Sequence, residues 1–269
     1  MTGRVAGTLG RVELPVDAVK VAEFARALRY SGTAVPPMFT VVAAHHTEPG
    51  ASPNELIIAA AGLDKPRVLL GSISWTVAEP LRRGDELVGV VALTQCEERT
   101  SRSGGLLRIA HGRTDFRTTA GEPRVTVDVD LIEAPPARAR AAAGAAGRSW
   151  PAAVGDDALV LSRTDIVRYA GASGDFNPMH HDAVAARRLG FPDVFAMGLL
   201  PGGIVAARAA ERLGELHAVT MRFRGIVWPD VPYRVEQTPP DARPAIGMRL
   251  IDPAGAAVLD VKASGGQTR

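Results

Sequence analysis

Hydrophobic and polar positions along the chain of 269 residues define two successive sets of elements in the same order. In each set a helix and an irregular segment come first, then a second helix, then several strands separated by short turns. The first set of predicted strands is Leu69–Val77, Glu86–Glu97, Leu106–Thr118 and Arg124–Ile132. The second set is Ala218–Phe223, Tyr233–Thr238, Ala245–Asp252 and Ala257–Ala263. The pattern predicts an α+β protein with two antiparallel sheets.

The two sets are separated by residues 134–153, a stretch rich in alanine, proline and arginine that has no apolar period. We expect this stretch to be a linker, because it is long enough when extended to carry the chain around one domain. The sets also share spaced apolar positions, and Val21 and Phe24 precede Ile166 and Tyr169 by one constant interval. The predicted organisation is therefore a domain over 1–133, a linker over 134–153 and a second, diverged copy over 154–269.

A polar loop follows the first helix of the second domain. Ile166, Tyr169, Ala170 and Ser173 recur at helical spacing, and Ser162 with Asp165 is positioned to cap the start of that helix. Gly174 and Pro178 then force the chain out of regular helix, within a string that runs from Gly174 to Asp182. This string brings Asp175 and His180 together, and such a pair can move a proton onto or off a substrate.

An aspartate five residues before a histidine is by itself usually a pair of solvated residues or a helix cap. The complete string is far more specific, and it resembles the MaoC-like or hydratase 2 family of (R)-specific enoyl-thioester hydratases and dehydratases. The positions that match the family pattern are Ser173, Gly174, Asp175, Asn177, Pro178, His180 and Asp182. A short helix, Ala183–Leu189, follows and is terminated by Gly190 and Pro192. Met197-Gly198-Leu199 then leads into a long buried helix predicted over Ile204–Leu213.

The resemblance implies a double hot-dog fold, in which each of two fused domains wraps an antiparallel sheet around a central helix. It places catalysis in the C-terminal domain. The N-terminal half is similar to the FAS1-like dehydratase domains that accompany MaoC domains, on the segments Pro36–Thr40 and Glu79–Asp85. Its implied role is accommodation of the acyl chain, since no Asp–His pair follows Leu28.

The implied reaction is that of a hydro-lyase, namely hydration of trans-2-enoyl thioesters and dehydration of (R)-3-hydroxyacyl thioesters. Asp175 and His180 would hold one water between them, and which of the two is the acid stays open because a coupled pair titrates as a unit. Asn177 would orient the pair or the water. The backbone N–H of Gly198 would stabilise the thioester oxyanion. The flanking residues Met197 and Leu199 complete the expected substrate-binding set.

Two departures from the family pattern keep alternatives open. Met197 stands where the family has histidine, and Gly203 stands where it often has a hydroxyl. One alternative is a hot-dog thioesterase, in which the same carboxylate directs water at the thioester carbonyl. The other is a non-catalytic subunit that binds acyl thioesters for a dehydratase complex. No Gly-x-Ser-x-Gly elbow and no dinucleotide fingerprint occur, which argues against a serine hydrolase or a redox enzyme.

Composition and charge limit the cofactors, partners and cellular location that we expect. Cys96 is the only cysteine, so an internal disulfide is excluded, and we expect neither a metal site nor a cofactor. The net charge of +2 does not favour nucleic acid, and the absence of a signal peptide and of a long apolar run predicts a cytoplasmic protein without a membrane span. The expected partners are acyl-CoA or an acyl carrier protein thioester, with Arg222 and Arg224 as candidate contacts, in a homodimer or a pseudo-dimeric monomer in fatty-acid or related acyl metabolism.

The remaining histidines are expected outside the site. His45 and His46 are interpreted as part of a solvated loop. His181 is expected to face away from the site, and His111 and His217 fall in strand positions where a structural role is the better interpretation.

Overall fold

The structure of the protein is a computed structural model. It describes residues 7–45, 51–100, 105–133, 158–238 and 245–265. The chain forms two compact units. The first is built mainly from residues 1–22 and 33–137, and the second from residues 23–32, 138–216 and 221–269. The proposed linker, 134–153, lies outside the described residues.

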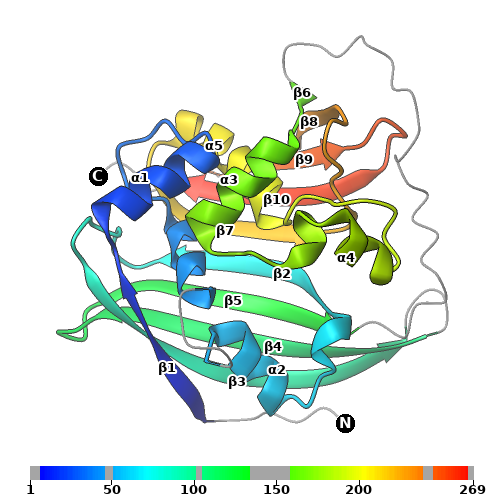
Figure 1. Ribbon diagram of the computed structural model, residues 1–269. Helices are drawn as coiled ribbons and strands as arrows, with labels where there is room; N and C mark the ends of the chain where they lie inside the picture. The colour runs from blue at the N-terminus through cyan, green and yellow to red at the C-terminus, as the bar shows by residue number, and fades with distance from the viewer. Residues whose placement is uncertain (1–6, 46–50, 101–104, 134–157, 239–244, 266–269) are drawn as a thin grey trace. The chain divides into compact units, whose positions relative to one another are not determined.

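The first unit contains five antiparallel strands in the order β1-β3-β4-β5-β2 (Figure 1). Their bounds are β1 Thr8–Pro15, β2 Val68–Val77, β3 Glu86–Thr100, β4 Leu106–Thr118 and β5 Pro123–Glu133. Three of the unit's helical segments are η1 Pro37–Ala44, α2 Pro53–Ala60 and η2 Lys65–Arg67. Helix α2 packs on the sheet through the fully buried Ile57. A Cβ on Gly112 would lie 2.2 Å from the Ile57 Cδ1 atom, so glycine in β4 permits this close approach.

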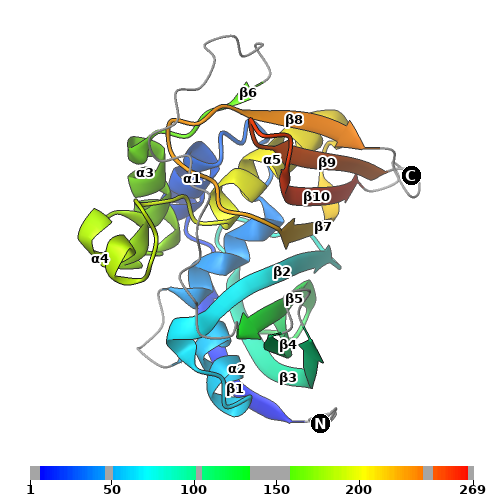
Figure 2. The ribbon, with the colours of Figure 1, turned by 90° about the vertical axis from the view of Figure 1, so that its right-hand side faces the viewer.

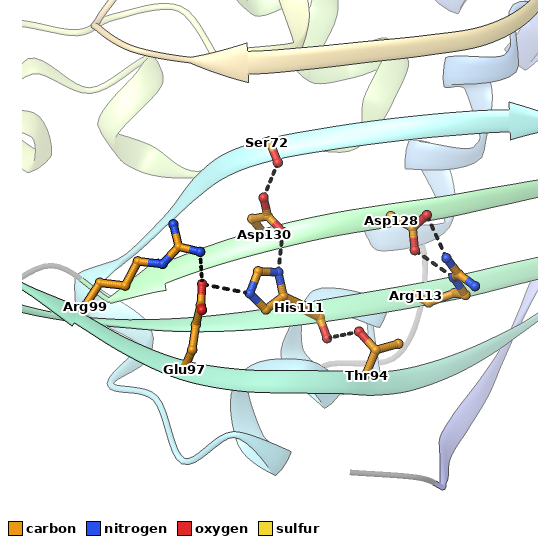
Figure 3. Close-up of polar contacts among 8 residues, drawn as sticks. All are labelled: Ser72, Thr94, Glu97, Arg99, His111, Arg113, Asp128 and Asp130. Atoms are coloured by element: carbon orange, nitrogen blue, oxygen red, sulfur yellow. Dashed lines mark hydrogen bonds and ion pairs between the residues drawn. The ribbon is translucent and has the colours of Figure 1, made fainter. Parts of the chain in front are cut away.

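The other face of this sheet is polar (Figure 3). His111 on β4 lies between two carboxylates, with Nδ1 2.7 Å from Asp130 and Nε2 3.2 Å from Glu97. The Ser72 hydroxyl donates to Asp130, and Arg113 forms a two-pronged pair with Asp128 at 2.7 and 3.1 Å. This alternation of an apolar and a polar face is what a half-buried antiparallel sheet requires. His111 therefore lies on a strand, as predicted, within a network of side chains.

The second unit carries the strand order β10-β9-β8-β6, and β7 is divided between the units, since its residues 217–220 belong to the first. The strands are β6 Ala158–Leu159, β7 Leu216–Phe223, β8 Tyr233–Thr238, β9 Ala245–Ile251 and β10 Ala257–Gly265. The helices of this part of the chain are α3 Arg163–Ser173, η3 Pro178–His180, α4 Ala183–Arg188 and α5 Leu199–Leu213. Helix α5 is buried along most of its length and packs on β9 and β10 (Figure 2). It is the central helix of this unit.

Helix α1, Ala18–Ala27, contributes to both units, because the division between them falls after Ala22. In the second unit its Phe24 ring packs against the ring of Tyr169 in α3, with the ring centroids 5.9 Å apart. Beyond the helix, the Arg29 guanidinium donates to the carbonyl of Val160 and pairs with Asp165. The C-terminal end of α1 is thus attached to the start of α3.

The predicted strands are confirmed, and their ends move by no more than three residues. Four features differ from the prediction. The long helix begins at Leu199 and not at Ile204, and the strands β1 and β6 were not predicted. Gly190 follows the short helix in a left-handed conformation, with φ of 86°, although the helix ends at Arg188 and not at Leu189. Among the described residues, no helix is both long and apolar enough to span a membrane.

Candidate active site

Helix α3 begins at the capping box that the sequence predicts. The Ser162 hydroxyl accepts from the N–H of Asp165, and the Asp165 carboxylate accepts from the N–H of Ser162 at 2.9 Å. Burial would raise the pKa of Asp165, but the hydrogen bonds from Ser162 and the charges of Arg29 and Arg168 outweigh it and hold the pKa below its usual range. The helix that leads to the polar loop is therefore fixed at its start by an ionised side chain.

The helix ends at Gly174, which adopts a left-handed φ of 85° and whose N–H donates to the carbonyl of Ala170. This C-terminal cap turns the chain sharply, and glycine adopts such a φ without steric cost. The buried Ser173 hydroxyl then donates to the Tyr169 carbonyl at 2.7 Å and accepts from the N–H of Asp175 at 3.2 Å. Ser173 thus ties the first residue of the loop back to the helix.

Asp175 and His180 are both bonded to the backbone of Asn177. The N–H of Asn177 donates to the Asp175 carboxylate at 3.3 Å, and the carbonyl of Asn177 accepts from the backbone N–H of His180 at 3.0 Å. The Asn177 side chain accepts from the N–H of Met179 at 3.4 Å. Pro178 begins the turn η3, as its fixed φ favours. The backbone of Asn177 is therefore bonded both to the Asp175 carboxylate and to the backbone N–H of His180.

His180 is buried, with 8% of its surface exposed, and its imidazole makes two contacts with Phe195. Its Nδ1–H donates to the Phe195 carbonyl at 2.8 Å, and the Phe195 ring meets it edge-on at a centroid distance of 4.8 Å. A carbonyl only accepts, so this bond selects the tautomer with hydrogen on Nδ1. In that tautomer Nε2 carries the lone pair of the neutral ring.

Tyr169, in α3, is almost completely buried. Burial, together with the charge of Asp175, raises the pKa of its phenol far above the usual range. The phenol therefore stays neutral. Sequence periodicity placed Tyr169 in the core, which is correct, but did not indicate its proximity to Asp175.

The two residues that follow His180 have other partners. Asp182 caps α4, accepting from the N–H of Val184 at 2.7 Å and of Ala185 at 3.3 Å. These bonds lower the pKa of Asp182. His181 is exposed and its Nε2 lies 3.2 Å from the carbonyl of Phe176. His181 thus lies outside the pair, as expected. Asp182, which matches an aspartate of the family pattern, caps α4.

Gly198 stands directly before the first turn of α5 and is solvent-exposed. A Cβ here would lie 2.8 Å from two ring atoms of Phe223, so the ring requires glycine. Met197 is 3% exposed and Leu199 is half-buried. A larger side chain does not fit at Gly203 either, because a Cβ there would lie 2.5 Å from the Leu28 side chain. Leu28 therefore fills the space beside the position where the family often has a hydroxyl.

The two arginines named as carrier contacts differ. Arg222 on β7 is exposed, whereas Arg224 donates to Asp260, which also pairs with Arg249. Within the described part of the chain, no group of three or more histidine, cysteine, aspartate and glutamate side chains is arranged to hold a metal ion. His217 lies on β7 and His45 is exposed at the end of η1, while His46 lies outside the described residues.

Both halves of the chain match known protein families. The MaoC-like domain family matches residues 152–239, and the FAS1-like dehydratase domain region matches residues 15–127. A curated relative, 3-hydroxyacyl-thioester dehydratase X of Mycobacterium tuberculosis, is 37% identical over 73 residues, which are 27% of this chain. The match spans only 25% of that relative.

Two solved structures define the fold. HtdX of Mycobacterium tuberculosis has a TM-score of 0.69 at 20% identity, covering 99% of this chain and 100% of the other. A second Mycobacterium tuberculosis protein, described as a double hotdog fold, has a TM-score of 0.56 at 12% identity and covers 98% of this chain and 94% of the other. The chain therefore has a double hot-dog fold, with a FAS1-like dehydratase domain region over residues 15–127 and a MaoC-like domain over residues 152–239.

Proposed function

We propose that the protein hydrates trans-2-enoyl thioesters to (R)-3-hydroxyacyl thioesters, and catalyses the reverse dehydration, with one water held between Asp175 and His180. The observation that carries the proposal is the attachment of both residues to Asn177, through an N–H to the Asp175 carboxylate and a carbonyl to the His180 N–H. These bonds fix the Asp175 carboxylate and the backbone of His180 within one turn, which favours a general acid–base pair because both side chains must come within hydrogen-bond reach of the same water.

The orientation of the imidazole supports the same assignment. With Nδ1–H bonded to the Phe195 carbonyl, the other ring nitrogen is the one that exchanges a proton with water. In the hydration direction the water loses one proton as its oxygen bonds to the β-carbon, and a proton is delivered to the α-carbon. Dehydration follows the same path in reverse, so one pair serves both directions.

Negative charge develops on the thioester oxygen during this reaction. We assign its stabilisation to the N–H of Gly198, at the positive end of α5. The carbonyl of Gly198 accepts from Gly202 inside the helix, whereas the first N–H groups of a helix have no partner within it. Met197 and Leu199, on either side, are assigned to the wall of the thioester site.

The domain roles follow from the same assignment. Residues 154–269 would carry the chemistry, and residues 1–133 would accommodate the acyl chain. Within the described residues of the N-terminal half, the segment after α1 contains no Asp–His pair. In the first unit, His111 on β4 is already hydrogen-bonded to Asp130 and Glu97 of the same sheet.

The test is loss of the enoyl-thioester absorbance when the purified protein meets crotonyl-CoA and a longer trans-2-enoyl-CoA, with Asp175→Asn as the control. Loss with the wild type alone is the expected result. The stereochemistry is tested by coupling the product to dehydrogenases specific for (R)- or (S)-3-hydroxyacyl thioesters, and only the (R)-specific enzyme should turn over.

A thiol reagent in the same assay separates this proposal from a thioesterase, because hydrolysis releases free CoA and hydration does not. Release of thiol without a 3-hydroxyacyl product would overturn the proposal. Binding of the thioester with neither reaction would identify a non-catalytic binding subunit.

A further inference from the structure

We propose that Tyr233 is a positioning residue for His180, on which it acts through two peptide groups linked in series by hydrogen bonds. This series, called here the Tyr233 chain, runs from the His180 imidazole through the peptide groups Phe195–Ala196 and Val227–Trp228 to the Tyr233 hydroxyl. The inference rests on the proposed function, since it names a further residue that the same reaction needs.

Three hydrogen bonds make up the Tyr233 chain. The imidazole donates from Nδ1 to the Phe195 carbonyl at 2.8 Å. The N–H of Ala196, in the same peptide group as that carbonyl, donates to the Val227 carbonyl at 2.9 Å. The N–H of Trp228, in the same peptide group as the second carbonyl, donates to the Tyr233 hydroxyl at 2.8 Å. All of these groups belong to the second unit.

A peptide group transmits a change of position from one of these bonds to the next. It is planar and trans, so its carbonyl and its N–H point in opposite directions and cannot turn independently. The bond made by the N–H of Ala196 therefore fixes the direction of the carbonyl that holds the imidazole. Hydrogen bonds in series also polarise one another, which strengthens each by about 10–30%. The Tyr233 hydroxyl is the acceptor at the end of this series.

The aromatic rings connect the same residues a second time. The Phe195 ring meets the His180 imidazole edge-on at a centroid distance of 4.8 Å, and it meets the Trp228 indole edge-on at 6.0 Å. Edge-on pairs at such distances are favourable. Trp228 and Tyr233 are both buried. A movement of Trp228 would therefore reach His180 through the Phe195 ring as well as through the backbone.

The sheet fixes the position of Tyr233. This residue begins β8 and pairs with Leu159 on β6. In the loop that leads from Trp228 to Tyr233, Asp230 adopts a left-handed φ of 60°, and its N–H donates to the Leu161 carbonyl at 2.7 Å. Burial raises the pKa of the Tyr233 phenol to about 12, so the hydroxyl stays neutral. The Tyr233 chain thus ends on a neutral acceptor held by a strand.

A positioning role differs from a purely structural one in its effect on the imidazole. A structural hydroxyl would only close the loop between Trp228 and Tyr233. A positioning hydroxyl also keeps the Phe195 carbonyl in place, and that carbonyl holds hydrogen on Nδ1 and leaves Nε2 to exchange a proton with water. Loss of the hydroxyl should therefore change the tautomer of a ring that lies three hydrogen bonds away.

The test is Tyr233→Phe, which removes the hydroxyl and keeps the ring. We expect kcat for hydration of crotonyl-CoA to fall about tenfold and KM to change by less than about twofold, because a small displacement of a reacting group is costly. NMR of protein labelled with 15N in histidine reports the tautomer of His180, whose signals are assigned by their loss in His180→Gln. We expect hydrogen on Nδ1 in the wild type and a mixture of both tautomers in Tyr233→Phe.

The matched control is Thr40→Val. The Thr40 hydroxyl also accepts from a buried tryptophan, since Trp75 Nε1 donates to it at 2.9 Å in the first unit. Each variant removes the hydroxyl acceptor of one buried N–H, so both should lower the midpoint of urea denaturation. Thr40→Val should leave kcat and the tautomer of His180 as they are in the wild type.

The outcomes are distinct. Wild-type kcat and tautomer in Tyr233→Phe, beside a stability loss like that of Thr40→Val, would limit Tyr233 to a structural role and overturn the inference while the proposed function stands. A lowered kcat with an unchanged tautomer would also overturn it, since the loss would not act through the imidazole. Absence of hydration of crotonyl-CoA and of a longer enoyl-CoA by the wild type would overturn the proposed function, and the catalytic role of Tyr233 with it.

Discussion

The Nδ1–H of His180 donates to the backbone carbonyl of Phe195 at 2.8 Å, although helix α4 lies between the two residues and they are fifteen positions apart. This bond orients the imidazole without using a second side chain. Because the partner is a backbone group, no substitution of Phe195 removes it directly. The activity of the pair must therefore be tested at His180 and at Asp175.

Replacing either member of the pair should abolish most of the hydration activity. We expect Asp175→Asn and His180→Gln each to lower kcat/KM for crotonyl-CoA about 100- to 10,000-fold, the usual cost of losing a general acid or base. The measurement is the initial rate of absorbance loss. His181→Gln is the matched control, because its side chain is exposed and lies one position away. A rate near that of the wild type in either pair variant contradicts the mechanism.

The sequence predicts the pair but did not indicate the groups that hydrogen-bond to its two members. The prediction rests on the complete string from Gly174 to Asp182, because an isolated aspartate and histidine at this spacing are usually solvated residues. The Phe195 carbonyl left no signal, because every residue has such a group. The start of α5 was also missed, since Pro201, Gly202 and Gly203 read as helix breakers. Proline is tolerated in the first turn, and the glycines are needed for contacts with Met221 and Leu28.

The strands likewise include some that the sequence predicts and some that it does not. Strands β2 to β5 and β7 to β10 were predicted because alternation and turns repeat along them. Strand β6 contains only two residues, which is too short for any period to be recognised. Strand β1 lies before the first helix and was not separated from the N-terminal segment, although Val12 and Leu14 alternate inward along it.

Ser173 should act as a positioning residue. Its hydroxyl accepts from the N–H of Asp175, so Ser173→Ala frees the first residue of the loop. We expect kcat to fall by up to about 100-fold, because small displacements of a reacting group are costly, while KM changes little. Stability should fall by about 1 kcal/mol in urea denaturation, the typical worth of one hydrogen bond. An unchanged kcat alongside that loss of stability would limit Ser173 to a structural role.

Asp165 should make stability depend on pH in the acid range. Its folded pKa lies below its usual range, so its contribution is complete above the unfolded pKa, near 3.9, and is lost as pH falls through the lower folded value. We expect Asp165→Asn to destabilise the protein by about 1 kcal/mol at pH 7, and the difference from the wild type to shrink below pH 4. Urea denaturation at both pH values measures it. A difference that stays constant down to pH 3 would show that the carboxylate charge is not responsible.

Gly203 and Leu28 should be energetically coupled. Gly203→Ser restores the hydroxyl that the family often carries, but its Cβ would lie 2.5 Å from the Leu28 side chain. We expect this variant to lose about 1–3 kcal/mol of stability through overpacking, and Leu28→Ala alone to lose about 2–5 kcal/mol through a cavity. In the double variant the new side chain enters the space that Leu28 vacates, so the combined loss should be smaller than the sum of the two. Strict additivity would show that the two positions do not share that space, and the glycine would then need another explanation.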